Sequence, residues 1–163
     1  MFKVGILVLS DKGSRGERED KSGEVVKEII GSIGGRVVHY EILPDDKETI
    51  VKKLVALCDE VEVDLVLTSG GTGLAPRDVT PEATAQVIDR PVPGIGEAMR
   101  AYGLRNTPRA MLSRGIAGIR RKTLIINLPG SVKGSRESLE AILPALEHAL
   151  GTLKGQAVEC GQD

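Results

Sequence analysis

Apolar residues in this chain form short continuous runs that alternate with stretches of helical spacing. Three runs rich in Val, Ile and Leu cover residues 4–9, 63–67 and 124–128, and each leads into a loop of Gly, Ser, Asp or Pro. Runs of this length and composition predict buried strands. A fourth run, residues 36–43, is more mixed and predicts a strand nearer a sheet edge.

Three other stretches repeat apolar residues every three or four positions, which is the spacing of one helix face. Their apolar members are Val25, Val26, Ile29, Ile30 and Ile33; Ile50, Val51, Leu54, Leu57 and Cys58; and Leu139, Ile142, Leu143, Leu146, Leu150 and Leu153. Pro144 predicts a kink or a break in the last stretch. Two helix starts are marked. Asp45 and Glu48 have the spacing of a capping box, and Thr80 followed by Pro81 is typical of an N-cap with proline at the first helical position.

Strands that alternate with helices predict an α/β fold, here a three-layer α/β/α sandwich with a largely parallel (mixed) central sheet. The 163 residues suit one domain, which we assign to residues 1–154. The polar tail, residues 155–163, is expected to fray. Ligands of open α/β sheets gather beyond the carboxyl ends of the strands. The corresponding loops here are residues 10–11, 43–46, 68–78 and 127–134.

The sharpest chemical feature is the glycine-rich loop of residues 68–73, Thr-Ser-Gly-Gly-Thr-Gly, directly after a predicted strand. Glycines let successive backbone N–H groups converge, and the hydroxyls add donors, so the loop is suited to phosphate oxygens. It has neither the lysine of a Walker A loop nor the spacing of a dinucleotide fingerprint. The alternative is a glycine-rich turn without a ligand.

Acidic residues flank this loop in the expected fold. Asp78 precedes a predicted helix and is suited to Mg²⁺ that bridges phosphates, or alternatively to supporting that helix through its dipole or as a cap near Thr80. Asp45 and Asp46 follow a strand; either could cap the next helix while its neighbour faces the ligand. Arg77 could pair with a phosphate or remain solvated.

Two further loops are weaker candidates. Residues 127–131, Asn-Leu-Pro-Gly-Ser, could offer donors to a nucleotide or only connect to the last helix. Ser10 and Asp11 follow the first strand, where polar pairs are common. Residues 20–23, Asp-Lys-Ser-Gly, could mark no more than a helix start.

Charge is balanced overall but uneven along the chain. The 22 basic and 23 acidic residues, with only two Tyr and one Phe, argue against a histone-like protein and against single-stranded nucleic acid held by aromatic stacking. Residues 98–136 contain nine Lys or Arg and no Asp or Glu, which leaves 13 basic and 23 acidic residues elsewhere. This segment predicts a polyanionic ligand; the alternatives are a solvated face and a contact with a neighbouring subunit.

Cysteine and histidine usage gives no metal signature. Cys58 and Cys160 are far apart, and His39 and His148 are isolated, so zinc spacing is absent. Cys58 lies on an apolar helix face and is expected to be a buried apolar residue. The sequence has no apolar run of the ~20 residues that a membrane span needs and no leader pattern. We therefore expect a cytoplasmic protein that binds neither membrane nor nucleic acid.

Five motifs together resemble the molybdopterin adenylyltransferase family, of the MogA type and related to the G domain of gephyrin. They are T-S-G-G-T-G at residues 68–73, P-R-D-V-T-P-E-A at 76–83, P-G-I-G-E-A-M-R at 93–100, M-L-S-R-G-I-A-G-I-R at 111–120 and I-I-N-L-P-G-S at 125–131. The resemblance covers residues 4 to about 153. Retention of R-D-V-T-P favours the adenylyltransferase branch over a sister group that differs at this point.

The resemblance implies a homotrimer that uses ATP and Mg²⁺ to adenylylate molybdopterin before a downstream enzyme inserts molybdate. It implies that Asp45 and Asp78 are catalytic and hold the metal. The residues implied or expected to bind substrate or nucleotide are Ser10, Ser69, Gly70, Gly71, Thr72, Gly73, Ser113, Arg114, Asn127, Gly130 and Ser131. Arg114 is our leading candidate for neutralising phosphate charge.

The implied reaction needs no histidine base. A phosphate monoester is largely dianionic at neutral pH because its second pKa is about 6, so it can attack the α-phosphate of ATP directly. The protein then has to bring two anions together and neutralise their charge. The alternatives are a non-catalytic molybdopterin carrier or scaffold and a sister-group enzyme that acts on another nucleotide.

Overall fold

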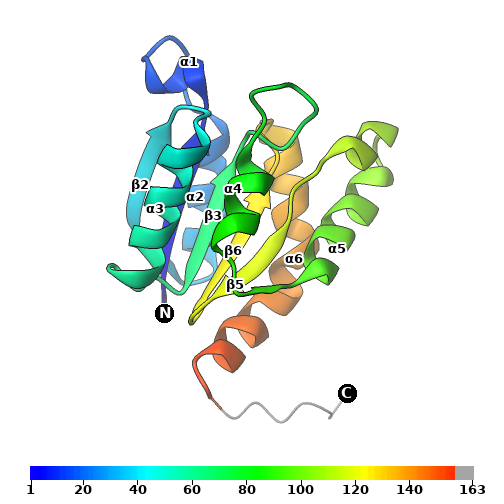
Figure 1. Cartoon of the computed structure of the whole chain (residues 1–163). Helices are drawn as coiled ribbons and strands as arrows, with labels where there is room; N and C mark the ends of the chain where they lie inside the picture. Colours follow the sequence, from blue (N-terminus) through cyan, green and yellow to red (C-terminus); the bar gives the residue numbers. More distant parts are fainter. Residues whose placement is uncertain (157–163) are drawn as a thin grey trace.

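The computed structural model of this chain describes residues 1–156, and residues 157–163, which include Cys160 and most of the predicted tail, lie outside the described residues. Six strands form one sheet in the order β2-β1-β3-β6-β5-β4 (Figure 1). The strands are β1 (Phe2–Leu9), β2 (Gly35–Leu43), β3 (Leu65–Ser69), β4 (Arg90–Pro91), β5 (Ala117–Arg120) and β6 (Thr123–Leu128). The helices are α1 (Asp11–Ser14), α2 (Ser22–Ser32), α3 (Lys47–Asp59), α4 (Thr80–Val87), α5 (Pro93–Leu104), the 3-10 helix η1 (Pro108–Leu112) and α6 (Val132–Leu153).

The sheet is mixed, as predicted. Strands β2, β1, β3 and β6 run parallel to one another, whereas β5 runs antiparallel to β6 and to β4. The mixed run of residues 36–43 forms β2 at one edge of the sheet, which confirms the edge position that its composition predicts.

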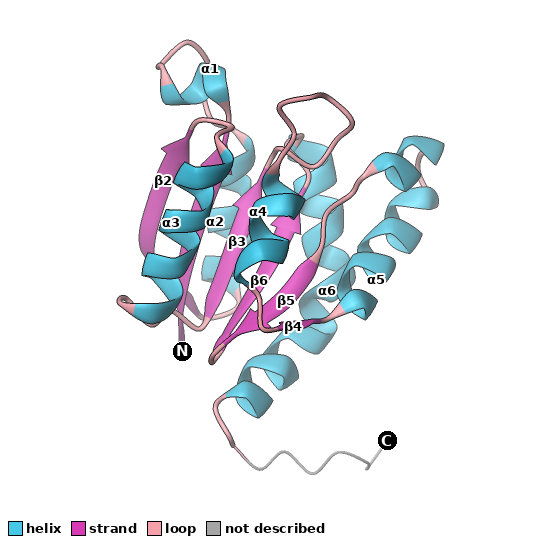
Figure 2. Ribbon diagram, in the orientation of Figure 1, coloured by secondary structure: helices cyan, strands magenta, loops and turns pink. Residues whose placement is uncertain are grey.

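Helices cover both faces of the sheet and give the predicted three layers (Figure 2). One face packs against α2, α5 and α6, and the other against α3 and α4. Alternate residues of β1 divide between the two cores: Ile6 and Val8 join the first, and Leu7 and Leu9 join the second. Because the central strands are buried on both faces, they appear in the sequence as continuous apolar runs.

Cys58 belongs to the second core with 3% of its surface exposed, so its prediction as a buried apolar residue is confirmed. Burial raises the pKa of its thiol to about 11, because the apolar surroundings disfavour the thiolate. Cys58 is therefore packed as a small apolar side chain rather than as a reactive one.

Both predicted helix starts are shifted by one residue. Asp46, not Asp45, caps α3, and its side chain accepts a hydrogen bond from the Thr49 amide at 2.9 Å; the Asp45–Glu48 capping box is wrong. Thr80 is the first residue of α4 rather than its cap. Its hydroxyl instead donates to the Gly70 carbonyl at 2.9 Å, so a tertiary contact replaces the expected cap.

The last helix runs through Pro144 without a break, because α6 is continuous from residue 132 to 153. The predicted split is therefore wrong. The buried side chains of α6 on both sides of Pro144, among them Leu139 and Leu146, pack into one core. We attribute the continuity to this packing, which offsets the lost backbone hydrogen bond.

The region between residues 88 and 120 holds elements that the apolar pattern does not predict, namely β4, α5, η1 and β5. Helix α5 carries three glycines within twelve residues, which weakens its apolar stripe. At the carboxyl ends of β1 and β3, α1 and the long 70–79 loop project above the sheet, opposite the N-terminus (Figure 1). The predicted site lies at this carboxyl end of the parallel strands.

Candidate active site

A cavity of about 570 Å³ lies at the carboxyl ends of β1 and β3. It brings together residues from the loops after four different strands, as the rule for α/β sheets predicts. The predicted site residues in its lining are Ser10, Asp45, Ser69, Gly70, Gly71, Asp78, Gly130 and Ser131.

The glycine loop turns sharply against the end of β1. Gly70 and Gly71 have positive φ angles of 104° and 69°, a region that residues with a side chain rarely adopt. A Cβ at Gly70 would lie 2.4 Å from the Leu9 carbonyl oxygen, and one at Gly71 would lie 2.2 Å from Thr80 Oγ1. Glycine is therefore required at both positions for the turn to face the cavity.

The second half of the loop is placed differently from expectation. Thr72 is 5% exposed, and neither Thr72 nor Gly73 lines the cavity. The carbonyls of both residues accept hydrogen bonds from Arg114, at 2.8 Å from its amide and 2.8 Å from its Nε. These two residues hold the loop in place, and their predicted contact with substrate remains a prediction.

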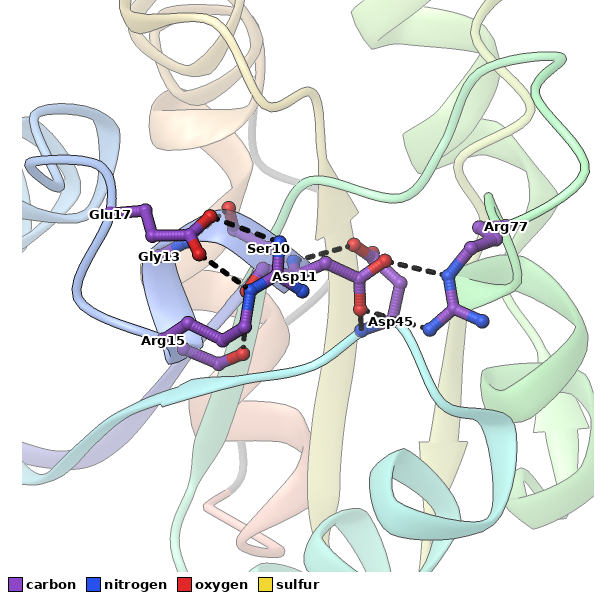
Figure 3. A network of polar contacts seen from close by, with 8 residues as sticks. Ser10, Asp11, Gly13, Arg15, Glu17, Asp45 and Arg77 are labelled. Carbon is purple, nitrogen blue, oxygen red and sulfur yellow. Dashed lines mark hydrogen bonds and ion pairs between the residues drawn. The ribbon is translucent and has the colours of Figure 1, made fainter.

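Asp45 and Asp11 hold one another by reciprocal hydrogen bonds, because the amide of each donates to the carboxylate of the other at 3.0 Å (Figure 3). Asp11 also receives two hydrogen bonds from Arg77, at 2.6 and 2.9 Å. The guanidinium of Arg77 is the main cause that lowers the pKa of Asp11. One network thus links the loops after β1, β2 and β3.

Asp45 has the opposite electrostatic environment. Burial raises the pKa of its carboxyl, and the nearby charges of Asp11 and Asp78 raise it further, while the Asp11 amide and Arg77 oppose them. A nearby cation would therefore stabilise the ionised form of Asp45. Since Asp46 caps α3, the Asp45 carboxylate faces the cavity.

Asp78 lines the same cavity and is held by its own loop. Its Oδ2 accepts a hydrogen bond from the Ala75 amide at 2.9 Å, and its carbonyl accepts one from Arg114 at 2.7 Å. It does not serve as the N-cap of α4, which is Val79. The capping alternative for Asp78 is thus excluded, and its carboxylate is presented beside the glycine loop.

Each guanidinium nitrogen of Arg114 bonds to an oxygen atom of the protein. Besides the carbonyls of Gly73 and Asp78, its guanidinium contacts the carboxylate of Glu82 in a close ion pair. It does not line either of the two cavities described here. The arginine that we expected to neutralise phosphate charge thus braces the segment that carries Asp78.

Asn127 is also engaged internally. It is 1% exposed, its amide donates to the hydroxyls of Thr68 and Thr84 at 3.0 and 2.9 Å, and its oxygen accepts from the Ile116 amide at 3.2 Å. It therefore joins β6 to β3, α4 and the segment before β5. Its predicted contact with ligand remains a prediction.

A second cavity of about 190 Å³ adjoins the first, because Ser131 lines both. Its lining includes the predicted residue Ser113 together with Arg100, Arg109 and Met99. The Ser131 hydroxyl also caps α6, since it accepts a hydrogen bond from the Gly134 amide at 3.0 Å. The two cavities thus meet at the N-cap of α6.

Buried serines connect the helices to the sheet below the larger cavity. The Ser69 hydroxyl lies 3.0 Å from that of Ser22 and donates to the Pro129 carbonyl at 3.1 Å. Ser135 donates to the same carbonyl at 2.7 Å. The first turns of α2 and α6 are thereby fixed beside the glycine loop.

Several basic side chains of residues 98–136 are bonded within the protein. Arg100 donates to the carbonyls of Ser113 and Gly115, and Arg120 pairs with Asp59 at 2.6 Å. Arg100 and Arg109 are its only basic members that line either described cavity. Much of the segment's charge is therefore used within the protein.

The segment that closes the larger cavity on the α2 side is not among the predicted site residues. Residues 18–22, Arg-Glu-Asp-Lys-Ser, all line this cavity. The available signal was its density of charge directly before a helix. We interpreted residues 20–23 as no more than a possible helix start, because an N-terminal Asp is common there.

Comparison with known proteins decides the family. The model of a probable molybdopterin binding domain matches residues 5–148. The molybdopterin adenylyltransferase of Helicobacter pylori (strain J99) is 45% identical over 98% of this chain and 92% of its own length. This chain belongs to the molybdopterin adenylyltransferase family. The resemblance given by the five motifs is thus confirmed.

This adenylyltransferase-family chain is also similar to a longer protein and to a solved structure. Gephyrin of Dictyostelium discoideum is 42% identical over 94% of this chain, which spans only 23% of gephyrin. The crystal structure of the molybdopterin biosynthesis enzyme MoaB from Thermus thermophilus has a TM-score of 0.91 and 56% identity, covering 95% of this chain and 98% of that one. The match with gephyrin thus involves one part of a longer protein.

The family places this chain in molybdenum cofactor biosynthesis. None of its described helices combines the length and apolar character needed to cross a membrane. Within residues 1–156, no group of three or more His, Cys, Asp or Glu side chains could hold a metal ion alone.

Proposed function

We propose that this chain transfers AMP from ATP to the phosphate of molybdopterin and releases pyrophosphate. The observation that carries the proposal is the convergence of Asp45, Asp78 and the glycine turn on one cavity. Its relatives named molybdopterin adenylyltransferase support the same reaction.

The donor set fits a hard divalent cation. Asp45 and Asp78 line one cavity, and the charge of Asp78 contributes to the raised pKa of Asp45. Mg²⁺ is usually held by one or two carboxylates together with waters and substrate phosphates, which agrees with the lack of a larger ligand cluster in residues 1–156. When bound, the cation would neutralise charge on the phosphates as it develops.

The chain's own groups would align the reactants. A phosphate oxygen of molybdopterin forms a bond to the α-phosphorus of ATP, the bond from that phosphorus to the bridging oxygen of the β-phosphate breaks, and pyrophosphate leaves with the electron pair. Within the glycine turn the Gly70 amide already donates to the Leu128 carbonyl at 3.0 Å, so the amide of Gly71, which lines the cavity, is the one left to donate to a phosphate oxygen. Asp45 and Asp78 would hold the cation, and Arg114 keeps the Asp78 segment in position.

Asp78→Asn tests the proposal most directly. The amide keeps the size of the side chain and can still accept the hydrogen bond from Ala75, but it lacks the charge that binds a cation. We expect pyrophosphate release from ATP and molybdopterin to fall at least about a hundredfold. The measurement is pyrophosphate release at fixed Mg²⁺, with circular dichroism as the check on folding.

Asp89→Asn is the matched control. Asp89 lies just beyond the other end of α4, is exposed, and accepts a hydrogen bond from the Arg121 amide at 2.8 Å. We expect this variant to retain activity. Normal turnover by Asp78→Asn would refute its assigned role, and wild-type protein that binds molybdopterin but releases no pyrophosphate would favour the carrier alternative.

Three expectations from the sequence stay predictions. They are the homotrimeric assembly, the transfer of product to a molybdate-insertion enzyme, and the cytoplasmic location. Sedimentation of the purified protein would test the first of these.

A further inference from the structure

The larger cavity has only two basic side chains in its described lining, Arg18 and Lys21. Both are exposed, and within residues 1–156 neither side chain has a hydrogen bond or ion pair. The acidic side chains of the same lining are Glu19, Asp20, Asp45 and Asp78. Anionic substrates therefore meet positive side-chain charge at one place in this cavity.

The other arginines around this edge are already paired. Arg77 is bonded to Asp11, Arg114 to Glu82, and Arg15 to Glu17. Releasing any of them for a ligand would leave its carboxylate partner without a counter-charge. Arg18 and Lys21 can bind an anion without breaking such a pair.

The backbone that carries Lys21 is well fixed. Asp20 accepts a close hydrogen bond from the Tyr40 hydroxyl and a second from the Gly23 amide at 2.9 Å. Ser22, the first residue of α2, is buried and contacts Ser69 at the end of β3. Lys21 is thus a flexible cationic side chain that starts from a rigid point beside the glycine turn.

Two helix starts in the lining of the cavity also favour an anion, although Glu19 and Asp20 directly precede Lys21 in the chain. The first amides of a helix lack intrahelical partners and carry partial positive charge, and α2 and α6 both begin at this cavity with Ser22 and Val132 in its lining. A phosphate in this cavity would meet the Lys21 side chain and the N-terminal ends of two helices, in which the Gly23 and Gly134 amides already donate to Asp20 and Ser131. These contributions act in the same direction.

We propose that Lys21, with Arg18, binds a phosphate group of a substrate in the larger cavity and holds it against Asp45 and Asp78. This inference rests on the proposed function, because it takes the substrates to be ATP and molybdopterin. Two sources share the required chemistry, the polyphosphate of ATP and the monoester phosphate of molybdopterin. The two cationic side chains thus take the role that we expected of Arg114.

The test uses the single variants Lys21→Met and Arg18→Met, the double variant, and Lys21→Arg as the conservative replacement. KM and kcat are measured separately for ATP and for molybdopterin by pyrophosphate release. Binding of ATP with Mg²⁺, without molybdopterin, is measured by calorimetry. Lys12→Met is the control, because Lys12 is an exposed lysine of α1 that does not line the cavity.

We expect Lys21→Met to raise KM for one substrate about tenfold, the effect of losing one hydrogen bond to a charged group. The double variant should raise it further, while kcat changes less and Lys21→Arg restores most of the affinity. An effect on KM for ATP and on its calorimetric affinity assigns the site to the polyphosphate. An effect on KM for molybdopterin alone assigns it to the monoester phosphate.

Wild-type activity with unchanged KM values for both substrates in the double variant would overturn this inference and leave the proposed function standing. An equal effect of Lys12→Met would overturn it as well, because general charge rather than position would then be responsible. Wild-type protein that releases no pyrophosphate would instead overturn the proposed function.

Discussion

The two sides of the larger cavity are built in different ways. On one side, Asp45 of the lining is bonded to Asp11 behind it, and Asp11 is bonded to Arg77, across three loops (Figure 3). On the other side, the side chains of Arg18 and Lys21 have no polar partner within the described chain. We call these the bonded side and the open side.

This difference separates two tasks. Groups that hold a metal ion near the reacting atoms must be fixed before the substrate arrives, because catalysis depends on preorganised charge. Side chains that bind a phosphate from solution can remain mobile, because they exchange bound water for the phosphate when the substrate arrives. Substitutions on the bonded side should therefore change kcat and its pH dependence, and those on the open side should change KM.

The largest effect on the bonded side is expected for Asp45→Asn. Loss of its charge should reduce pyrophosphate release at least about a hundredfold. The same variant should be more stable than wild type at pH 8. The folded-state pKa of Asp45 is raised, so the folded protein loses stability as the pH rises through the unfolded and folded pKa values, and asparagine removes this loss.

Thermal unfolding measured at pH 4 and pH 8 checks this prediction, and we expect a higher Tm at pH 8 by about 2 °C or more. Asp46→Asn is the control, because Asp46 is exposed, lies outside the cavity lining and caps α3. Asparagine also caps helices, so activity and stability should both be retained. A decrease in Tm at pH 8 for Asp45→Asn would contradict the electrostatic explanation.

A smaller effect is expected on the pH dependence of kcat. Substitutions of Asp11 and Arg77, which both act on the pKa of Asp45, should shift this dependence in opposite directions. The charge of Asp11 raises the pKa of Asp45, and the charge of Arg77 lowers it. Cation binding requires ionised Asp45, so activity is lost as the pH falls through this pKa. Asp11→Asn should move the acidic limb of kcat to lower pH, and Arg77→Met should move it to higher pH.

The pH–rate profiles of both variants between pH 4 and pH 9 measure this pair of shifts. Arg15→Met provides the comparison, since Arg15 pairs with Glu17 and is not among the causes of the Asp45 shift. Shifts of the same sign in Asp11→Asn and Arg77→Met would show that general disruption of the network, rather than charge, determines the pH at which activity is lost.

The smallest effect is expected from salt. Exposed charges are screened over about 10 Å at 0.1 M ionic strength and over about 3 Å at 1 M. Raising the salt concentration should therefore increase KM for the substrate held on the open side. The increase should be smaller in the Arg18→Met, Lys21→Met double variant, and an equal salt dependence would show that the two side chains do not supply the attraction.

The parts of the fold that the sequence predicts are those with a strong local pattern. Strands buried on both faces and long amphipathic helices leave a clear apolar period. Helix α5 and the antiparallel β5 do not, because three glycines dilute α5 and β5 has only four residues. Helix α4 begins one residue earlier than predicted, because the Thr80 hydroxyl bonds to the Gly70 carbonyl rather than capping the helix.

The candidate site was predictable where chemistry coincides with the carboxyl end of a strand. Asp45, Asp78 and the first glycines of the loop lie in the cavity for that reason. Arg114 was less predictable, because an isolated arginine in the sequence does not show whether its partner is a ligand or a protein carbonyl. Lys21 precedes a helix rather than following a strand, so the topological rule did not select it.

The internal hydrogen bonds of Asn127 have a consequence for folding. Strand β6 is buried along its whole length and consists otherwise of Thr, Leu and Ile, so apolar burial alone does not distinguish one pairing register from the next. A slip of β6 against β3 would move the Asn127 amide away from Thr68 and leave it unpaired in the core, which costs about 1–3 kcal/mol. One polar side chain thereby selects a single register in the centre of an otherwise apolar sheet.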